Sequence, residues 1–438
     1  MIDRRQMIAG TMALAATPAR AAASKSRAAT FPKGFLWGAS TAPHQIEGNN
    51  TTSDLWYLEH QQPTIFAEPS GDAANSLLLW ERDLELARSL GLNTYRFGVE
   101  WARIEPAKGQ FSQAMLDHYA RIVDRCLALG LTPVVTYSHF TAPLWFSAQG
   151  GWTNPDSAAL FARYAERVTR AIGDRIHSVI TLNEPNILLL LKPMLPPPVW
   201  EIQKQTIETA ARRLGVPRFI CANVAGPDDL ADLQRGLLAG HRAARSAIKA
   251  VRAQLPVGVS LAMLDDQAAS AASIRDRMRG ELYGEWLSEA RGDDFIGVQN
   301  YERAVWGEQG RLPPPEGAVR NWSGSEVYAP SLAGAVRYAH AATGVPVLVS
   351  EHGVGTDDDA VRAALIPAAL KGLHQAMADG VPVLGYCHWS LIDNFEWIFG
   401  YKPKFGLASV DPQTFARTPK PSAAVLATIA RANAVGEG

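Results

Sequence analysis

The stretch Val179-Ile180-Thr181-Leu182-Asn183-Glu184-Pro185 decides the fold, because a second stretch, Val347-Leu348-Val349-Ser350-Glu351-His352-Gly353, repeats its pattern. Each is a short run rich in Val, Ile and Leu that reaches a glutamate and then, within two residues, Pro or Gly. Continuous apolar runs of this kind are typical of parallel strands that are buried on both faces. Barrel enzymes carry their reacting groups at the C-terminal tips of such strands, so we expect Glu184 and Glu351 at one barrel mouth.

Strand-like and helix-like segments alternate on both sides of these stretches. Strands are predicted at 35–39, 93–99, 133–137, 178–182, 257–263, 295–300, 346–349 and 383–388. Helices are predicted at 78–90, 115–129, 158–172, 230–253, 275–290, 331–342, 358–379 and 422–432, the first three followed by a glycine that stops the helix. The alternation predicts an α/β fold, a single (β/α)8 TIM barrel with long βα loops over its C-terminal face.

Two stretches lack a clear pattern. They are 193–229, which contains Pro196-Pro197-Pro198, and 307–330, which contains Pro313-Pro314-Pro315. Both follow predicted strand tips, so we expect irregular loops that hang over the barrel mouth and shape substrate choice.

The composition allows one large core. The chain has 438 residues, 47% hydrophobic and 19% charged, which is ordinary for a globular protein. Length alone would suggest two or three domains, but no linker is visible and a barrel with long loops can use it all. The formal net charge of -1 gives no indication of nucleic acid or an anionic membrane surface as a partner. The three widely spaced cysteines indicate neither a disulfide framework nor a metal site.

The first 23 residues are predicted to be a processing signal, and the barrel domain to span 31–438. Arg4-Arg5 precedes an Ala-rich, weakly apolar run, and Ala19-Arg20-Ala21 fits a small-x-small cleavage site. The paired arginines resemble a twin-arginine export signal, which would place a folded enzyme in a bacterial periplasm. The alternative is a basic, disordered start on a cytoplasmic protein. No other stretch approaches the roughly 18 to 20 apolar residues of a membrane span.

Polar and aromatic residues gather at the predicted strand tips. In chain order they are Gln45, Arg96, His139, Asn183, Glu184, Asn300, Tyr301, Glu351, Trp389, Glu396 and Trp397. Amide, imidazole and carboxylate groups pair with sugar hydroxyls, and an indole packs against the C–H face of a sugar ring. Two converging carboxylates are also the minimum apparatus for cleaving a glycosidic bond. The set as a whole favours a carbohydrate-active barrel.

Each of these residues has a structural interpretation when it is taken alone. A glutamate before proline, like Glu184, is commonly a loop cap, and a histidine at a strand end, like His139, is commonly a satisfied structural group. Trp389 and Trp397 could belong to the core, and Arg96 could form a structural ion pair. Their common position at strand tips is what favours chemistry.

Four groups of motifs resemble a known family. They are Phe35 to Thr41 with Gln45-Ile46-Glu47-Gly48, Tyr95-Arg96-Phe97, Thr181 to Asn186, and Trp389 to Trp397 with Gly400-Tyr401 and Phe405-Gly406-Leu407. On these motifs the chain resembles glycoside hydrolase family 1 from about Phe31 to its C-terminus. The resemblance implies a (β/α)8 barrel and a retaining exo-β-glycosidase. The first candidate is a β-glucosidase acting on terminal non-reducing β-D-glucosyl residues of short glucosides or oligosaccharides.

The resemblance also implies a role for each matched position. Glu184 corresponds to the family's acid/base and Glu351 to its nucleophile. The residues that bind hydroxyls of the cleaved sugar are Gln45, His139, Asn183, Glu396 and Trp397, and Trp389 is the platform beneath it. Arg96 and Tyr301 flank the nucleophile, and Asn300 is taken as a further supporting residue. No metal or organic cofactor is needed.

The physical chemistry agrees with these roles. In the retaining mechanism the two carboxyl groups stand ~5 to 5.5 Å apart, so the charge of Glu351 should raise the pKa of Glu184. Glu184 then protonates the leaving oxygen while Glu351 attacks the anomeric carbon and forms a covalent glycosyl-enzyme. Loss of the charge on Glu351 lowers the pKa of Glu184, which can then act as a base toward water. Arg96 would keep Glu351 ionised.

The match to the family has departures. His44 stands where the family usually has Tyr, Phe140-Thr141 where it has Trp-Asp, and His352-Gly353 where it has Asn-Gly. The segment after Asn186 also lacks the usual Ala-Pro-Gly loop. These changes concern the aglycone side and the surroundings of the site, whereas the partners of the cleaved sugar are retained.

Two carboxylates that this chain retains argue against two branches of the family, whereas the substrate and the type of reaction stay open. Glu396 suits neutral hydroxyls and would repel a 6-phosphate, and Glu184 argues against the thioglucosidase branch, which has Gln there. A transglycosidase with the same residues and a non-catalytic sugar-binding barrel remain alternatives. The sequence does not decide the aglycone, the linkage, the choice among glucose, galactose and fucose, or the oligomeric state.

Overall fold

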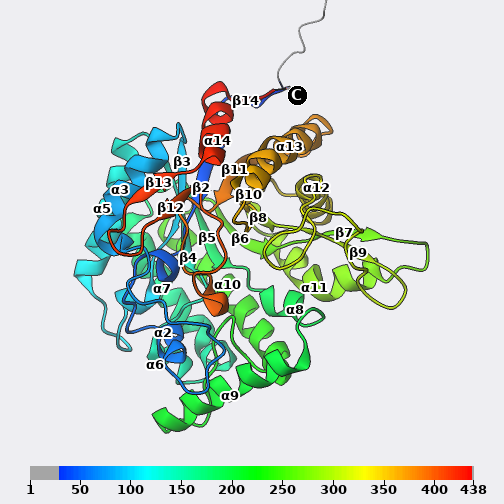
Figure 1. Ribbon diagram of the computed structural model, residues 1–438. Coiled ribbons are helices and arrows are strands. Elements are labelled where there is room, and N and C mark those ends of the chain that lie inside the picture. The colour runs from blue at the N-terminus through cyan, green and yellow to red at the C-terminus, as the bar shows by residue number, and fades with distance from the viewer. Residues whose placement is uncertain (1–28, 437–438) are drawn as a thin grey trace, which may run out of the picture.

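Parallel strands close into a barrel at the centre of the molecule (Figure 1). The computed structural model describes residues 29–436. The barrel strands are β2 (Leu36–Ser40), β3 (Thr94–Gly98), β4 (Thr132–Ser138), β5 (Ser178–Asn183), β6 (Val257–Ala262), β8 (Phe295–Asn300), β10 (Val347–His352) and β11 (Val383–Trp389). Because β11 pairs with β2, the last barrel strand meets the first and closes the sheet. The predicted TIM barrel is confirmed, and all of its predicted strands are present.

The predicted helices are also present and cover the outside of the barrel. They are α3 (Ser76–Ser89), α5 (Gln113–Ala128), α7 (Ser157–Ile172), α10 (Leu230–Val251), α11 (Arg275–Ala290), α12 (Ser331–Thr343), α13 (Asp359–Ala378) and α14 (Pro421–Ala432). In α5, for example, Leu116, Tyr119 and Val123 form one buried face. Its first turn is capped by Ser112, whose hydroxyl accepts a hydrogen bond from Met115 N at 3.3 Å.

The inside of the barrel is layered. Toward the N-terminal ends of the strands one apolar cluster fills it, made of Leu36, Val134, Ile180, Phe295 and Leu348. The layer closer to the mouth is polar and buried, and contains Ser40, Arg96, Thr136, Ser260 and Ser350. Its hydroxyls are paired, since Ser40 Oγ donates to Ser350 O at 2.8 Å and Ser260 Oγ to Ser350 Oγ at 3.0 Å. A charged side chain can be buried in this layer because partners are available there.

The segment 193–229 is not the irregular loop that its prolines predicted. It contains α9 (Pro197–Leu214), a helix of 18 residues that follows the short α8 (Ile187–Leu191). Prolines occupy the first helical positions of α9, where a missing N–H costs no hydrogen bond, so here they start a helix. Gly215 ends it with a φ of 66°. By contrast, 307–330 is irregular as predicted, with only isolated bridges such as Arg320 to Glu326.

Short elements surround the barrel. They are α1 (Pro43–Ile46), α2 (Asp54–Glu59), α4 (Trp101–Ile104), α6 (Leu144–Ser147), the 3-10 turns η1 (Gly151–Thr153), η2 (Pro227–Asp229) and η3 (Trp397–Phe399), and the strand pairs β7 (Asp265–Ala268) with β9 (Arg303–Trp306) and β12 (Ala408–Val410) with β13 (Arg417–Pro419). At the ends of the described chain, β1 (Ala29–Thr30) pairs antiparallel with β14 (Ala434–Val435) (Figure 1). Within 29–436 no helix is long and apolar enough to cross a membrane. The predicted signal, 1–23, lies outside the described residues.

Candidate active site

Glu184 and Glu351 line the same cavity, of about 230 Å³. Glu184 follows β5 directly and Glu351 lies near the end of β10, so the ends of two barrel strands bring them together. Glu184 has a φ of 42°, a left-handed backbone conformation that glutamate rarely adopts. Its N–H donates to Ser260 O on the neighbouring β6 at 2.8 Å, which helps to hold this strained turn.

Both carboxylate oxygens of Glu351 have a donor. Arg96 Nη1 donates to Oε1 at 2.5 Å, and Tyr301 Oη donates to Oε2 at 2.6 Å. Tyr301 also lines the cavity, whereas Arg96 is fully buried in the polar layer of the barrel. Two charge-assisted hydrogen bonds to different oxygens restrict the rotation of the carboxylate, so Glu351 is oriented before substrate binds.

Arg96 is itself held from three strands. Its Nη2 donates to Asn183 Oδ1 at 2.5 Å, its Nε to Thr136 Oγ1 at 3.2 Å, and its Nη1 also to Ser350 O at 3.2 Å. A buried guanidinium is costly unless its donors are satisfied, and here each nitrogen has a partner. Arg96 therefore links the tips of β4, β5 and β10 in one network.

The proton shared by the two glutamates belongs on Glu184. Burial raises the pKa of Glu184 well above its ordinary value, and the charge of Glu351 adds to the rise while Arg96 opposes it. Burial also raises the pKa of Glu351, but there Arg96 and the hydrogen bond from Tyr301 oppose the rise. Glu351 is thus the stronger acid of the pair, so it carries the charge while Glu184 stays protonated.

Aromatic rings cover one side of the cavity. The ring of His139 stacks on Trp389 and on Trp397, with centroids 5.7 and 5.8 Å apart, and all three residues line the cavity. Glu396 lies beside them and accepts a hydrogen bond from Trp389 Nε1 at 3.3 Å. Burial, assisted by Arg96, lowers the pKa of His139 well below its ordinary value, so the ring is neutral. A neutral imidazole can either donate to or accept from a hydroxyl.

Asn183 does not line the cavity but keeps one group free. Its Oδ1 accepts from Arg96 and, at 2.6 Å, from Gln299 Nε2, while its buried Nδ2 has no partner among the described residues. Asn300 has no such free group, because Nδ2 donates to Met263 O at 2.8 Å and Oδ1 accepts from Ser331 Oγ. Asn300 therefore holds the chain beside the site, whereas Asn183 has a donor left for a substrate.

Gln45 also stands outside the cavity lining, and it contacts the loop that carries Glu396. Its Nε2 donates to Asn394 Oδ1 at 3.0 Å and to Phe395 O at 2.8 Å, while its buried Oε1 has no partner in the described chain. Burial raises the pKa of Glu396 well above its ordinary value, and the hydrogen bond from Trp389 opposes the rise. Gln45 thus orders this part of the site.

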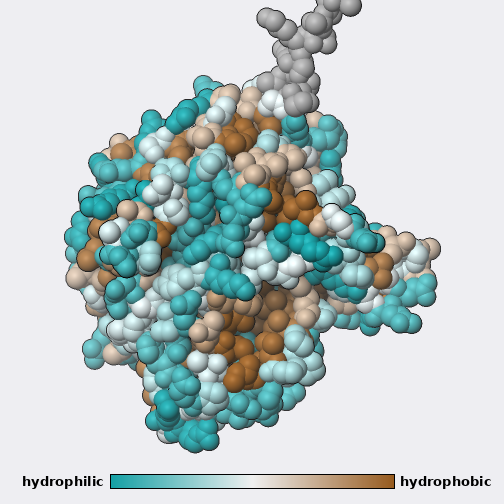
Figure 2. Space-filling model, viewed as in Figure 1, coloured by the Kyte–Doolittle hydropathy of each residue, from teal (hydrophilic) through white to brown (hydrophobic). Residues whose placement is uncertain are grey.

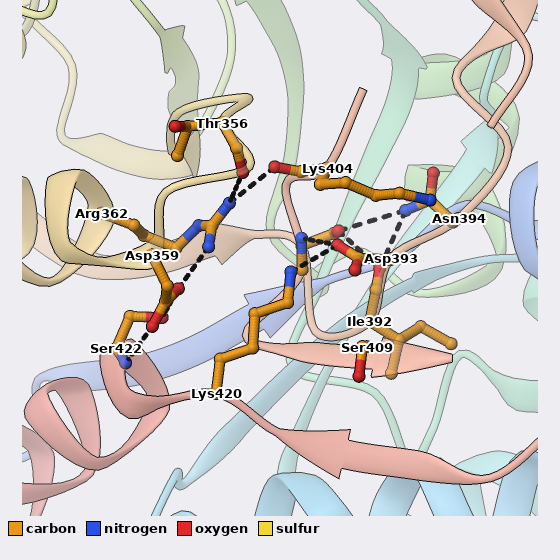
Figure 3. Close-up of polar contacts among 12 residues, drawn as sticks. Thr356, Asp359, Arg362, Ile392, Asp393, Asn394, Lys404, Ser409, Lys420 and Ser422 are labelled. Carbon is orange, nitrogen blue, oxygen red and sulfur yellow. Dashed lines mark hydrogen bonds and ion pairs between the residues drawn. The ribbon is translucent and has the colours of Figure 1, made fainter. Parts of the chain in front are cut away.

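The loop after β11 is braced by polar networks (Figure 3). Asp393 accepts from Lys420 Nζ at 2.7 Å and from Gly406 N at 2.8 Å. Asn394 Nδ2 donates to Ile392 O at 3.2 Å, beside Asp393. These contacts fix the segment that presents Glu396 to the cavity.

A second network anchors the other limb of this loop (Figure 3). The fully buried Arg362 donates to the carbonyl oxygens of Lys404 at 2.6 Å and Thr356 at 3.2 Å, and pairs with Asp359. Asp359 in turn accepts from Ser422 N at 2.7 Å, at the start of α14. These contacts connect the loop after β10 to the loop after β11 and to the start of α14.

A buried ion pair next to Trp397 was not predicted. His44 Nε2 lies 2.7 Å from Glu59 Oε1, and its ring is stacked on Trp397 at 5.8 Å with planes 5° apart. Burial works to lower the pKa of His44, but the charge and hydrogen bond of Glu59 outweigh it, so the pKa is raised. The departure at His44 was visible in the sequence, whereas its partner Glu59 had no motif to reveal it.

The residues of the remaining cavity walls were not named from the sequence, although 193–229 and 307–330 were expected to lie over the barrel mouth. They lie in α8 and the turn after it, in α9 and the segment after it, and in the loops after β9 and β11. They are Ile187, Leu191, Leu195, Gln203, Asn223, Trp322, Ile398, Phe399 and Phe405, together with Phe140 after β4. Figure 2 shows apolar side chains gathered around a hollow on this face. The run Ile187-Leu188-Leu189-Leu190-Leu191 after the Glu184 motif was a signal that could have been used, since apolar residues beside a strand tip often line a site.

The chemistry that this arrangement offers is that of two carboxylates, one protonated and one charged, beside polar and aromatic side chains. Within residues 29–436 no three His, Cys, Asp or Glu side chains are grouped to hold a metal ion. Cys126, Cys221 and Cys387 are buried free thiols, and burial raises the pKa of each.

Comparisons with known proteins agree with this geometry. A sequence model of Glycosyl hydrolase family 1 matches residues 27–207 and 322–435. The thermostable β-glucosidase B of Thermobispora bispora is 30% identical over 93% of this chain and 92% of its own. The apo structure of β-glucosidase 1317 superposes with a TM-score of 0.87 at 42% identity, over 91% of this chain and 98% of its own. A β-glucosidase from Thermotoga maritima in complex with glucoimidazole superposes with a TM-score of 0.80 at 25% identity, over 93% and 100% of the two chains.

Proposed function

The chain belongs to glycosyl hydrolase family 1 and is a β-glucosidase-type glycoside hydrolase, and we propose that it is an exo-acting enzyme that cleaves with retention. Its substrates are terminal β-D-glucosides of small molecules. Glu184 donates a proton to the leaving oxygen while Glu351 attacks the anomeric carbon. Glu184 then takes a proton from a water molecule, which attacks the anomeric carbon and breaks the ester bond to Glu351. The resemblance to β-glucosidases supports glucose as the sugar.

The observation that best supports the retaining mechanism is that Glu351 is both oriented and negatively charged. Arg96 and Tyr301 hold its two oxygens, and the charge stays on Glu351 because Glu184 has the higher pKa. A nucleophile needs this oriented, charged carboxylate. Attack removes the charge, so one contribution to the raised pKa of Glu184 disappears when a base is needed.

Substitution of the two glutamates tests the roles. On an alkyl glucoside, whose leaving group needs a proton, Glu184→Gln should lower kcat about a hundredfold to ten-thousandfold, and Glu351→Ala at least as much. Glu308→Gln, at an exposed carboxyl outside the cavity, is the matched control and should behave like the wild type. An alkyl-glucosidase activity that survives either active-site change would refute the assignment.

A panel of nitrophenyl β-glycosides tests the sugar. We expect the glucoside to have the highest kcat/KM among glucoside, galactoside, fucoside and xyloside, because Glu396, Gln45 and His139 remain as hydroxyl partners. A preference for another sugar of more than tenfold would reject the glucosidase assignment while leaving the glycosidase assignment intact.

We also propose that the enzyme is exported to the periplasm. The proposal is supported by Arg4-Arg5, the Ala-rich run after it and the cleavage pattern near Ala21. Mass spectrometry of the N-terminus in periplasmic and cytosolic fractions should find a shortened chain in the periplasm. An intact N-terminus confined to the cytosol would contradict export.

A further inference from the structure

We propose that the outer part of the active-site cavity binds an apolar aglycone, an aryl or alkyl group, in preference to a second sugar. The inference rests on the proposed function, because it concerns the group that leaves when the glucosyl bond is cleaved. It names a substrate class that neither the family nor the two glutamates decide.

One wall is a leucine-rich helix whose side chains divide between core and cavity. Ile187 and Leu191 line the cavity and are four residues apart, so they share one face of α8, and Leu195 in the turn after α8 lines the cavity as well. Leu188 and Leu190 on the other side are buried in the core. Ile187 and Leu191 pack against the core but are only partly buried, so they also present apolar surface to the cavity.

A second wall is aromatic. Trp322 and Phe399 meet edge to face, with centroids 4.6 Å apart, and both line the cavity. Trp322 packs on Gly355, where any Cβ would lie 2.2 Å from Trp322 Cδ1, so the backbone is shaped to keep the indole in place. Phe399 is 44% exposed, which is a cost for a phenyl ring that a bound apolar group would remove.

Phe140 and Thr141 stand where the family usually has Trp-Asp, so the second position after His139 carries no carboxylate here. Phe140, in a left-handed conformation with φ 68°, lines the cavity and packs edge to face on Trp397 at 5.0 Å. Thr141 follows where a carboxylate is usual, and its hydroxyl is buried and donates to Glu100 Oε2 at 2.7 Å. This side of the cavity offers a ring face and no charge.

Few polar groups remain for the hydroxyls of a second sugar. Apart from the residues assigned to the cleaved sugar and its hydrolysis, the polar side-chain groups among the cavity-lining residues of the described chain are those of Gln203 and Asn223 and the single indole N–H of Trp322. Gln203 Nε2 already donates to Ala225 O at 3.2 Å, and Asn223 Oδ1 has no partner within the described residues. A sugar would bury several hydroxyls without partners, which costs free energy for each, whereas an apolar group with at most one hydroxyl would not.

A substrate series tests the proposal directly. β-Glucosyl fluoride has no aglycone, and methyl, butyl and octyl β-glucosides have alkanol leaving groups of comparable basicity. The sugar hydroxyl that leaves cellobiose is somewhat more acidic, so leaving-group chemistry alone would favour cellobiose. We expect kcat/KM to rise from methyl to octyl by up to about fourfold per methylene over the first few carbons. Octyl glucoside should exceed cellobiose at least tenfold.

The outcomes separate the two proposals. A flat alkyl series, or cellobiose as the better substrate, would overturn the apolar-aglycone proposal while leaving the glucosidase intact. Failure to hydrolyse even glucosyl fluoride would instead overturn the proposed function.

Two substitutions in α8, one at the cavity and one away from it, test whether the cavity wall causes the preference for an apolar aglycone. Leu191→Gln should lower the ratio of kcat/KM for octyl glucoside to that for glucosyl fluoride about tenfold. Leu189→Gln, in the same helix but outside the cavity lining, should leave that ratio unchanged. Should Leu191→Gln fail to fold, Phe399→Ser on the exposed side of the cavity replaces it with the same expectation. An unchanged ratio in the folded cavity variants would overturn the assignment.

Discussion

At the scale of single residues, Glu351 owes its ionisation to two neighbours. Tyr301→Phe removes the donor 2.6 Å from Oε2 and keeps the ring. Because that hydrogen bond lowers the pKa of Glu351, its loss should move the acidic limb of kcat/KM to higher pH. A hydrogen bond to a charged group is worth about 1.5 to 3 kcal/mol, so kcat should also fall roughly tenfold or more. Tyr328→Phe, outside the cavity, is the control, and an unmoved acidic limb would contradict the role of Tyr301.

The charge of Glu351 should also have a measurable effect on the pKa of Glu184. The basic limb of kcat/KM marks loss of the Glu184 proton, so activity falls as pH rises through that pKa. In Glu351→Gln the neighbouring charge is gone, and the pKa of Glu184 should fall, although burial still holds it above the ordinary value. Carbon NMR of labelled glutamate across a pH titration measures this. An unshifted Glu184 signal would show that the two groups do not interact.

Residue types at strand tips were predictable, and the family resemblance also placed Arg96 and Tyr301 beside Glu351, but the contacts made by the loops over the mouth were not predictable. Glu184, Glu351, Arg96 and Tyr301 could be named from motifs, because a strand end has a defined place in a barrel. The stack of His44 on Trp397, and the left-handed backbone of Glu184, depend on how loops cross over the mouth. Such contacts join segments far apart in sequence, for which no local periodicity exists.

At the scale of elements, α10 packs on the 3-10 turn η1 through a glycine. A Cβ on Gly236 would lie 1.6 Å from Trp152 O, so Gly236→Ala should push α10 away and lower the free energy of unfolding by about 1 to 3 kcal/mol or more. Gly280→Ala in α11 meets open space and should stabilise by about 0.5 to 1 kcal/mol. Chemical denaturation of both variants measures the difference, and a Gly236→Ala protein as stable as Gly280→Ala would contradict the packing.

The one long helix that was missed shows where local signals mislead. Pro196-Pro197-Pro198 indicated a loop, yet proline at the first helical positions starts α9. The glycines after predicted helices indicated the helix ends correctly. Gly91 and Gly130, which follow α3 and α5, take left-handed φ values of 77° and 70°. Gly173 after α7 has a helical φ, so its backbone does not require glycine. A side chain is excluded there because a Cβ would lie 2.5 Å from Thr169 O.

At the scale of the whole molecule, the two ends of the described chain meet beneath the barrel. Asn433 Nδ2 donates to Phe31 O at 2.7 Å and its Oδ1 accepts from Trp37 Nε1 at 2.9 Å. Its φ of 48° also suits Asn or Gly better than Ala. Asn433→Ala should therefore cost about 2 to 4 kcal/mol, more than Asn433→Gly, which keeps the backbone conformation. Calorimetry at one scan rate compares the two, and equal Tm values for both variants and the wild type would contradict this closure.

The barrel as a whole was predictable because strands and helices of ordinary length alternate with clear periods. Strand order follows from that alternation, since consecutive parallel strands joined by helices lie side by side. The two stretches that cover the outer cavity were predictable, but the residues that line it were not, because the segment after β5 and the loop carrying Trp322 meet there although they are far apart in sequence.

The most direct test of the account is covalent capture of the nucleophile. Incubation with an activated 2-deoxy-2-fluoro-β-glucoside should stop turnover and add one fluoroglucosyl group to the intact protein, and peptide mapping should place it on Glu351. The Glu351→Ala protein should gain no mass. A label on another residue, or full inactivation without any covalent adduct, would contradict a retaining mechanism through Glu351.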